Sequence, residues 1–108
     1  MKPESKKALL GMIGLCRRAG GVICGSDLVC GELGTRRPPE LVIVSETASE
    51  ATVDRITKKC FHYQVKCLVL PVTTEELGRA VGKLGSIAAI AIRHPAFAKR
   101  IEELTNET

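Results

Sequence analysis

Apolar residues recur near the start of the chain at the spacing of an amphipathic helix. Leu9, Ile13 and Cys16 follow one another at four- and three-residue steps, which places them on one face. The same helical spacing recurs at Val53, Ile56 and Cys60. Three other segments begin with residues that favour a helix start. We therefore predict five helices: residues 4–19, residues 27–33, a segment that begins after Ser49 and includes Cys60, a short segment between Thr73 and Gly82, and residues 95–104.

Short uninterrupted apolar runs lie between these helices. The run 41–44 reads LVIV and is β-branched at three of its four positions, which is typical of a strand buried on both faces. The predicted strands are residues 22–24, 41–44, 67–70 and 87–92. Continuous apolar strands between amphipathic helices require helices on both faces of the sheet. We predict an α/β fold, a three-layer α/β/α sandwich with element order α-β-α-β-α-β-α-β-α and a mixed central sheet.

Several helix starts carry a capping residue. Ser26 and Ser49 are predicted N-caps, since a serine hydroxyl accepts from the free amides of the first turn. Thr73 and Glu76 have the spacing of a capping box. Pro95 suits the first turn of the last helix.

Length and composition favour a single small domain. The 108 residues suffice for one core, and we expect one domain over 1–108 with an ordered core of about 4–104. Apolar residues make up 44% and charged residues 26%, as in an ordinary folded protein. No apolar run approaches the roughly 18 residues of a membrane span, and the charged N-terminus lacks the features of a signal peptide. We expect a cytoplasmic protein without a membrane partner.

The charge balance permits a phosphate-bearing partner. Sixteen basic and twelve acidic residues leave a net charge of +4. Only Phe61, Tyr63 and Phe97 are aromatic, so there is no platform for stacking single-stranded bases. An RNA partner would have to be recognised through its shape, groove edges and backbone.

The residues do not form a catalytic or metal-binding pattern. Five cysteines form no C-x-x-C pair and sit among aliphatic neighbours, as reduced core residues do, so we expect no metal and no cofactor. His62 and His94 lie far apart in the sequence, each at a position that suits a solvated or capping histidine. The turn before residue 28 reads GSD, without a Walker or G-x-G-x-x-G pattern. We predict that the protein is not an enzyme.

Four sequence stretches resemble one known family. Residues 76–82 read ELGRAVG and residues 88–92 read AAIAI, similar to that family's E-L-G-x-A-x-G and A-A-x-A-I signature. The stretches LCRRAG (15–20) and SETAS (45–49) resemble its bacterial branch. Over about residues 8–100, the chain resembles the L-seven-Ae ribosomal protein family, which includes kink-turn RNA binders, and in particular its YlxQ-like branch.

The resemblance implies an RNA-binding surface made by three segments. Its candidate contact residues are Gly25, Ser26, Asp27, Leu28 and Gly31, then Glu46 in the loop that continues to Ala48, then Lys83, Leu84, Gly85 and Ser86. Candidate phosphate contacts are Arg36, Arg37 and Arg79.

One part of the family pattern differs here. The family's RNA binders carry G-x-N-E-x-x-K at the second helix, and counting from Gly25 places Asp27 at the asparagine. Leu28 then stands at the glutamate and Gly31 at the lysine. Neither can make a polar contact with RNA through its side chain, so we expect weakened kink-turn selectivity.

Together these features favour a non-catalytic RNA-binding protein that acts on ribosomal or other structured RNA, as a ribonucleoprotein component in translation. Ribosomal or assembly proteins are candidate partners. One alternative is a protein-interaction module of the same fold that has lost kink-turn recognition, and a smaller one is an α/β enzyme or small-ligand binder.

Overall fold

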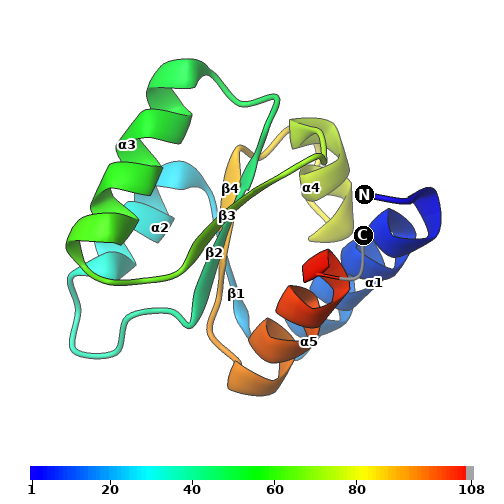
Figure 1. The fold of residues 1–108 in the computed structure, drawn as a ribbon, viewed down its shortest axis with the longest axis horizontal. Coiled ribbons are helices and arrows are strands. Elements are labelled where there is room, and N and C mark those ends of the chain that lie inside the picture. Colours follow the sequence, from blue (N-terminus) through cyan, green and yellow to red (C-terminus); the bar gives the residue numbers. More distant parts are fainter. Residues whose placement is uncertain (107–108) are drawn as a thin grey trace.

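The computed structural model describes residues 1–106, over which five helices alternate with four strands (Figure 1). The elements are α1 (Pro3–Arg18), β1 (Val22–Cys24), α2 (Ser26–Leu33), β2 (Leu41–Ser45), α3 (Glu50–His62), β3 (Cys67–Leu70), α4 (Thr74–Ala80), β4 (Ala89–Ile92) and α5 (Pro95–Asn106). This order confirms the predicted α/β alternation. No helix in the described part of the chain is both long and apolar enough to cross a membrane.

The four strands form one mixed sheet in the order β1-β4-β2-β3. β2 runs parallel to β3, while β4 is antiparallel to both β1 and β2. Cys24 on β1 and Val44 on β2 therefore pair with neighbouring residues at the start of β4. The loops that follow β1, β2 and β3 and the loop that precedes β4 consequently meet at one end of the sheet.

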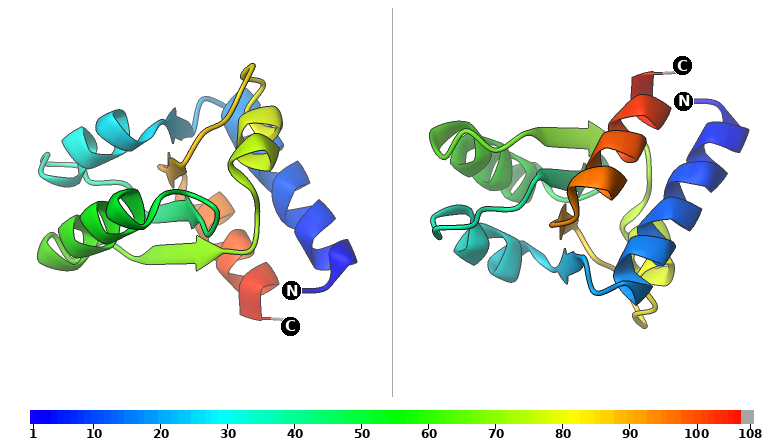
Figure 2. Two further views of the ribbon diagram at one scale, coloured as in Figure 1. Left: turned by 90° about the horizontal axis from the view of Figure 1, so that it is seen from above. Right: turned by 90° about the horizontal axis from the view of Figure 1, so that it is seen from below.

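Helices cover both faces of the sheet, which confirms the three layers. α2 and α3 pack on one face, and α1, α4 and α5 pack on the other (Figures 1 and 2). Alternate residues of β2 serve the two layers: Leu41 and Ile43 belong to the core under α1, whereas Val42 and Val44 belong to the core under α3. All five residues of β2 are buried, as the continuous apolar run predicts.

Two strand predictions need correction. The continuous apolar run 67–70 also predicts a buried strand, but β3 is the edge strand of the sheet, and its Val69 is 43% exposed. β4 begins at Ala89, two residues later than expected. Ile87 instead donates its amide to the carbonyl of Thr74 at 2.9 Å, so the chain before β4 pairs with α4 rather than with a strand.

Of the three N-cap predictions at Ser26, Ser49 and Thr73, two are confirmed and one is wrong. Ser49 accepts a hydrogen bond from the Thr52 amide, and Thr73 and Glu76 form the complete capping box. Ser26, however, is not an N-cap. It is the first helical residue of α2, and the N-cap is Gly25, whose φ of 99° is a backbone conformation that glycine adopts without strain.

Candidate nucleic-acid interface

Backbone hydrogen bonds hold together the strand ends from which three segments project at one end of the sheet. The Gly25 amide donates to the carbonyl of Ala89 at 3.0 Å, and the Ser45 amide donates to the carbonyl of Ala88 at 2.9 Å. The Glu46 amide donates to the carbonyl of Leu70 at 3.0 Å. We call the segments 25–28, 46–48 and 83–88 the loop end of the sheet. They include the segments 25–28, 46–48 and 83–86, which the family resemblance predicts to act together.

The loop between α4 and β4 is fixed against its own helix. A Cβ on Gly78 would lie 2.1 Å from the carbonyl oxygen of Gly85, so only glycine fits in α4 at this point. The Lys83 amide donates to the Gly78 carbonyl at 2.8 Å, and Gly82 and Gly85 both have positive φ. The glycines of the ELGRAVG stretch thus have a physical role: they allow helix and loop to touch. The loop presents Lys83 and a fully exposed Leu84 to solvent.

The buried hydroxyl of Ser45 anchors the loop after β2. Ser45 Oγ donates to the carbonyl of Val72 at 2.6 Å and accepts from the Thr47 amide at 3.1 Å. Thr47 Oγ1 in turn accepts from the Thr74 amide at 3.1 Å, which links the loop to the start of α4. With its neighbours held inward, the side chain of Glu46 is exposed at the surface.

The start of α2 carries an ion pair that sequence reasoning did not identify. Arg55 Nη2 on α3 donates to Asp27 Oδ1 at 2.9 Å, and this hydrogen bond raises the pKa of the Arg55 guanidinium. The partners lie 28 positions apart, so no local pattern links them. Arg55 offsets the negative charge of Asp27 at the helix N-terminus.

The two positions that differ from the family pattern are both open to solvent. Leu28 is 65% exposed, and a Cβ added at Gly31 would meet no atom within 4 Å. Each can therefore carry a longer polar side chain without a steric clash.

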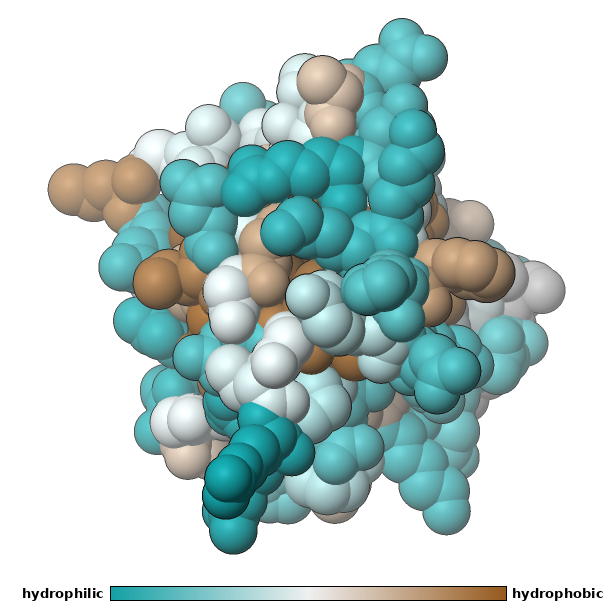
Figure 3. All heavy atoms as spheres, turned by 90° about the vertical axis from the view of Figure 1, so that its left-hand side faces the viewer, coloured by the Kyte–Doolittle hydropathy of each residue, from teal (hydrophilic) through white to brown (hydrophobic). Residues whose placement is uncertain are grey.

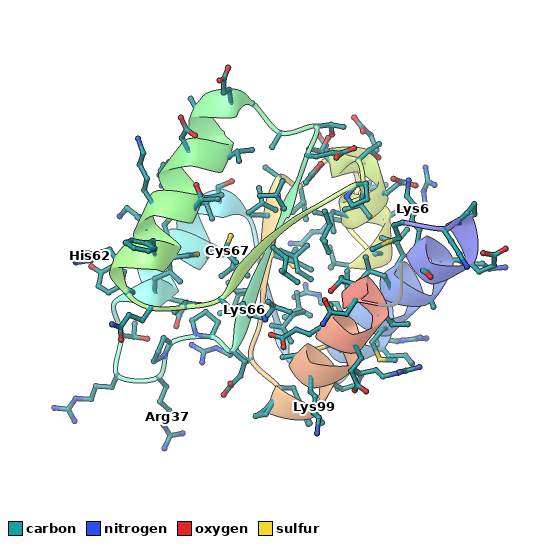
Figure 4. The ribbon with its side chains drawn as sticks, in the orientation of Figure 1. Lys6, Arg37, His62, Lys66, Cys67 and Lys99 are labelled. Atoms are coloured by element: carbon teal, nitrogen blue, oxygen red, sulfur yellow. The ribbon has the colours of Figure 1, made fainter. Side chains whose placement is uncertain are left out.

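The three arginines predicted to contact phosphate lie at two different ends of the sheet. Arg79 lines a shallow hollow of about 470 Å³ together with Lys83 and residues 84–86, so it belongs to the loop end. Arg36 and Arg37 lie in the linker between α2 and β2, at the opposite end of the sheet. Figure 4 shows Arg37 pointing away from the rest of the molecule. The structure does not bring these two arginines together with the other candidates.

The cysteines and histidines lie within packed layers or beside aromatic rings. All five thiols are free, and a hydrogen bond to Cys67 together with burial raises the pKa of the Cys60 thiol. Within residues 1–106, no group of three His, Cys, Asp or Glu side chains is placed to hold a metal ion. His62 packs edge-on against Tyr63, and His94 packs edge-on against Phe97.

The face that carries α2 and α3 is mainly hydrophilic. Figure 3 shows hydrophobic side chains projecting singly from it, without a continuous apolar patch. Polar and charged groups therefore dominate what a partner would meet on this side of the molecule.

Two curated relatives match nearly the whole chain. The RNA-binding protein YlxQ of Bacillus subtilis (strain 168) is 33% identical over 93 residues, covering 86% of this chain and 90% of the relative. The RNA-binding protein YlxQ of Enterococcus faecium is 29% identical over 104 residues, covering 96% and 97%. No protein-family model matches the chain.

Solved structures show the same fold. A protein of unknown function from Bacillus halodurans C superposes with a TM-score of 0.83 at 28% identity, covering 92% of this chain and 97% of the other. The Giardia lamblia 15.5kD RNA binding protein superposes with a TM-score of 0.79 at 19% identity, covering 99% and 89%. Given the identity and coverage of the Bacillus subtilis relative, this chain belongs to the YlxQ family, the branch that its sequence resembles.

Proposed function

We propose that the protein binds structured RNA through the loop end of the sheet, without catalysing a reaction, and that its targets are ribosomal or other kink-turn-containing RNAs. The observation that supports this most directly is the geometry of the loop end, where three segments far apart in the sequence adjoin strand ends that backbone hydrogen bonds hold together. A surface that is ordered before binding loses less conformational entropy when RNA docks.

The chemistry of the loop end suits an RNA read by shape and backbone. Lys83 and Arg79 are exposed cations beside backbone held in place by glycine. The first amides of α2 point outward as at any helix start, and the Arg55 pair reduces the repulsion that Asp27 alone would exert on a phosphate. None of the three aromatic residues lies in the loop end, so we do not expect recognition by base stacking.

Selectivity for a kink-turn should be modest. Leu28 has no polar group for a base edge, and Gly31 has no side chain to reach RNA. Since a good bidentate base contact is worth about 1–3 kcal/mol of discrimination, the absence of two such side chains lowers the preference for a particular RNA. Leu28 and Leu84 can still make apolar contacts with a base that leaves its stack.

The proposal is tested by measuring affinity for a kink-turn RNA and for a control RNA whose tandem G·A pairs are replaced. We expect binding to both, with a preference below about a thousandfold, or some 4 kcal/mol. The double variant Leu28→Glu with Gly31→Lys should sharpen the preference, because both positions have open space. The matched control is Leu28→Gln with Gly31→Ala, which removes the leucine and the glycine without adding charge.

Three results would contradict this account. A preference above a thousandfold in the wild type would show that Leu28 and Gly31 do not limit recognition. A double variant no more selective than the wild type, or undetectable binding of every structured RNA at low salt, would favour the alternative of a protein-interaction module, to which the exposed Leu28 and Leu84 would then belong.

A further inference from the structure

The C-terminal ends of α1 and α4 meet on the side of the molecule next to the loop end. The helices approach closely because Gly14 faces α4: a Cβ there would lie 3.2 Å from the carbonyl oxygen of Ala80. Both views in Figure 2 show the end of α1, the body of α4 and the loop before β4 side by side. Arg17 and Arg18 occupy the last turn of α1, and Arg79 occupies the last turn of α4.

These arginines border two adjoining hollows that share Arg79. One hollow is lined by Arg17, Arg18 and Arg79 over a floor that includes Gly14 and Gly82. The other is lined by Arg79 and Lys83 with Glu75 and the loop residues 84–86. We call the combined surface, with Arg17, Arg18, Arg79 and Lys83 as its cations, the arginine groove.

The cations of the arginine groove are free to bind an anion. Within residues 1–106 none of the four forms an ion pair, whereas Lys6, Arg55, Lys66 and Arg93 each do. The carboxylate that lines the groove is Glu75, so positive charge prevails there. Glu76 nearby is already occupied by Lys6 and by the Thr73 amide.

Favourable interaction with the helix dipoles explains only part of this arrangement. Arginines in a last turn stabilise a helix by about 0.3–1 kcal/mol, which would account for Arg17, Arg18 and Arg79 separately. It does not account for Lys83, which lies beyond α4 in the loop, nor for two helices whose cationic ends adjoin the same hollow.

We propose that the arginine groove is a second RNA contact, which holds the phosphate backbone of a double-helical stem as the stem leaves the loop end and passes α4 toward the end of α1. This inference rests on the proposed RNA-binding function. A stem is favoured over a single strand because no aromatic side chain is among the residues that line either hollow. Arginine guanidinium groups match phosphate geometry, and the glycines of the floor let a backbone approach closely.

The salt dependence of binding tests this contact. Each phosphate that a cation neutralises steepens the fall of log affinity with log salt by nearly one unit. We expect a wild-type slope of about −2 to −4, which Arg17→Gln with Arg18→Gln should make shallower by about one to two units. From 50 to 200 mM salt, the affinity of this variant should therefore fall by a factor about 4 to 16 times smaller than that of the wild type.

A matched control lies at the other end of the molecule. Arg36→Gln with Arg37→Gln also removes two adjacent arginines and the same net charge, but from the linker far from the loop end. This variant should keep the wild-type slope. Circular dichroism and melting temperature confirm for each variant that the fold is intact.

Shortening the RNA supplies a second, independent readout. Each of the two stems that flank the kink-turn is shortened in turn, and one of these truncations should weaken wild-type binding. The same truncation should leave the affinity of the Arg17→Gln, Arg18→Gln variant unchanged, because the contact has already been removed from the protein side.

The possible outcomes separate the two proposals. Equal slopes for the wild type and the Arg17→Gln, Arg18→Gln variant, or equal changes in both arginine-pair variants, would overturn the arginine groove while leaving RNA binding at the loop end in place. Failure of the wild type to bind any structured RNA would overturn both. A shallower slope for the α1 variant alone, together with its insensitivity to one stem, would support the groove.

Discussion

The two ends of the sheet both carry positive charge, but they use it differently. At the loop end, backbone hydrogen bonds and positive-φ glycines hold the chain in place, and Lys83 and Arg79 form no ion pairs among residues 1–106. At the opposite end, the guanidinium of Arg93 binds the Glu32 carboxylate and donates to the carbonyl of Arg37 at 3.0 Å. There Arg93 holds the protein together while Arg37 points away from it; at the loop end Arg55 pairs with Asp27, whereas Lys83 and Arg79 are left available.

Neither charge nor the size of a hollow distinguishes the proposed binding surface from the opposite end of the sheet. The hollow at the opposite end, lined by residues 37–40 and 64–66 and by Arg93, is about 640 Å³ and larger than the 470 Å³ hollow beside Lys83. Its rim includes the proline-containing linker, which is anchored mainly through Arg93 and through the amide of Glu40. What distinguishes the loop end is a fixed backbone under unpaired cations.

The largest effect should come from filling the contact that fixes the loop end. Gly78→Ala would place a methyl group 2.1 Å from the Gly85 carbonyl oxygen, where backbone rather than a flexible side chain must move. We expect a loss of about 2 kcal/mol or more in the free energy of unfolding, measured by urea denaturation, together with weaker RNA binding.

Gly31→Ala is the matched control for that change. Gly31 is also a helical glycine, but its added Cβ meets no atom within 4 Å. Alanine there should stabilise the protein by about 0.5–1 kcal/mol through helix propensity. If Gly78→Ala were as stable as the wild type, the loop would not be held by its contact with α4.

The next largest effects should come from breaking the two arginine–carboxylate pairs, Arg93–Glu32 at the opposite end of the sheet and Arg55–Asp27 at the loop end. Arg93→Gln removes hydrogen bonds to both Glu32 and the linker carbonyl, so it should lower the free energy of unfolding by about 1–2 kcal/mol without changing RNA affinity. Arg55→Gln breaks a solvent-accessible pair and should change stability little, but it should weaken RNA binding because Asp27 then repels phosphate unopposed. Both variants are measured by denaturation and by RNA-binding assays. The comparison would be wrong if Arg93→Gln weakened RNA binding without lowering stability and Arg55→Gln lowered stability without weakening RNA binding.

The smallest effect concerns the capping box beside the loop end. The Thr73 amide and Lys6 hold the pKa of Glu76 below its ordinary value of 4.5. A carboxylate with a lowered pKa stabilises the fold above its unfolded pKa, and this contribution is lost as the pH falls through the folded value. Glu76→Gln should therefore melt slightly below the wild type at pH 7, and the difference should begin to shrink near the unfolded pKa of about 4.5 and vanish once the pH lies below the folded pKa.

Glu75→Gln is the control for this measurement, because Glu75 shares the same helix turn but makes no capping bond. A gap between Glu76→Gln and wild type that persisted unchanged at pH 2 would show that it does not arise from the ionised carboxylate.

The sequence alone predicts those structural features that depend on residues close together in the chain. The element order, the buried β2 strand and the Thr73–Glu76 capping box all depend on residues within one turn or one strand, and all three are confirmed. The meeting of the three loop-end segments was predicted from a family resemblance rather than from any spacing in this chain. The structure supplies its cause in the antiparallel pairing of β4 with both β1 and β2.

Features that depend on distant partners were decided only by the tertiary structure. An apolar strand looks the same in sequence at the centre and at the edge of a sheet, so the exposure of Val69 on β3 could not be anticipated. Two adjacent arginine pairs likewise look equivalent, yet packing of Gly14 against Ala80 places Arg17 and Arg18 beside Arg79, while the linker carries Arg36 and Arg37 to the far end. Such placements depend on which surfaces pack together across the sheet, and that information is spread over residues tens of positions apart.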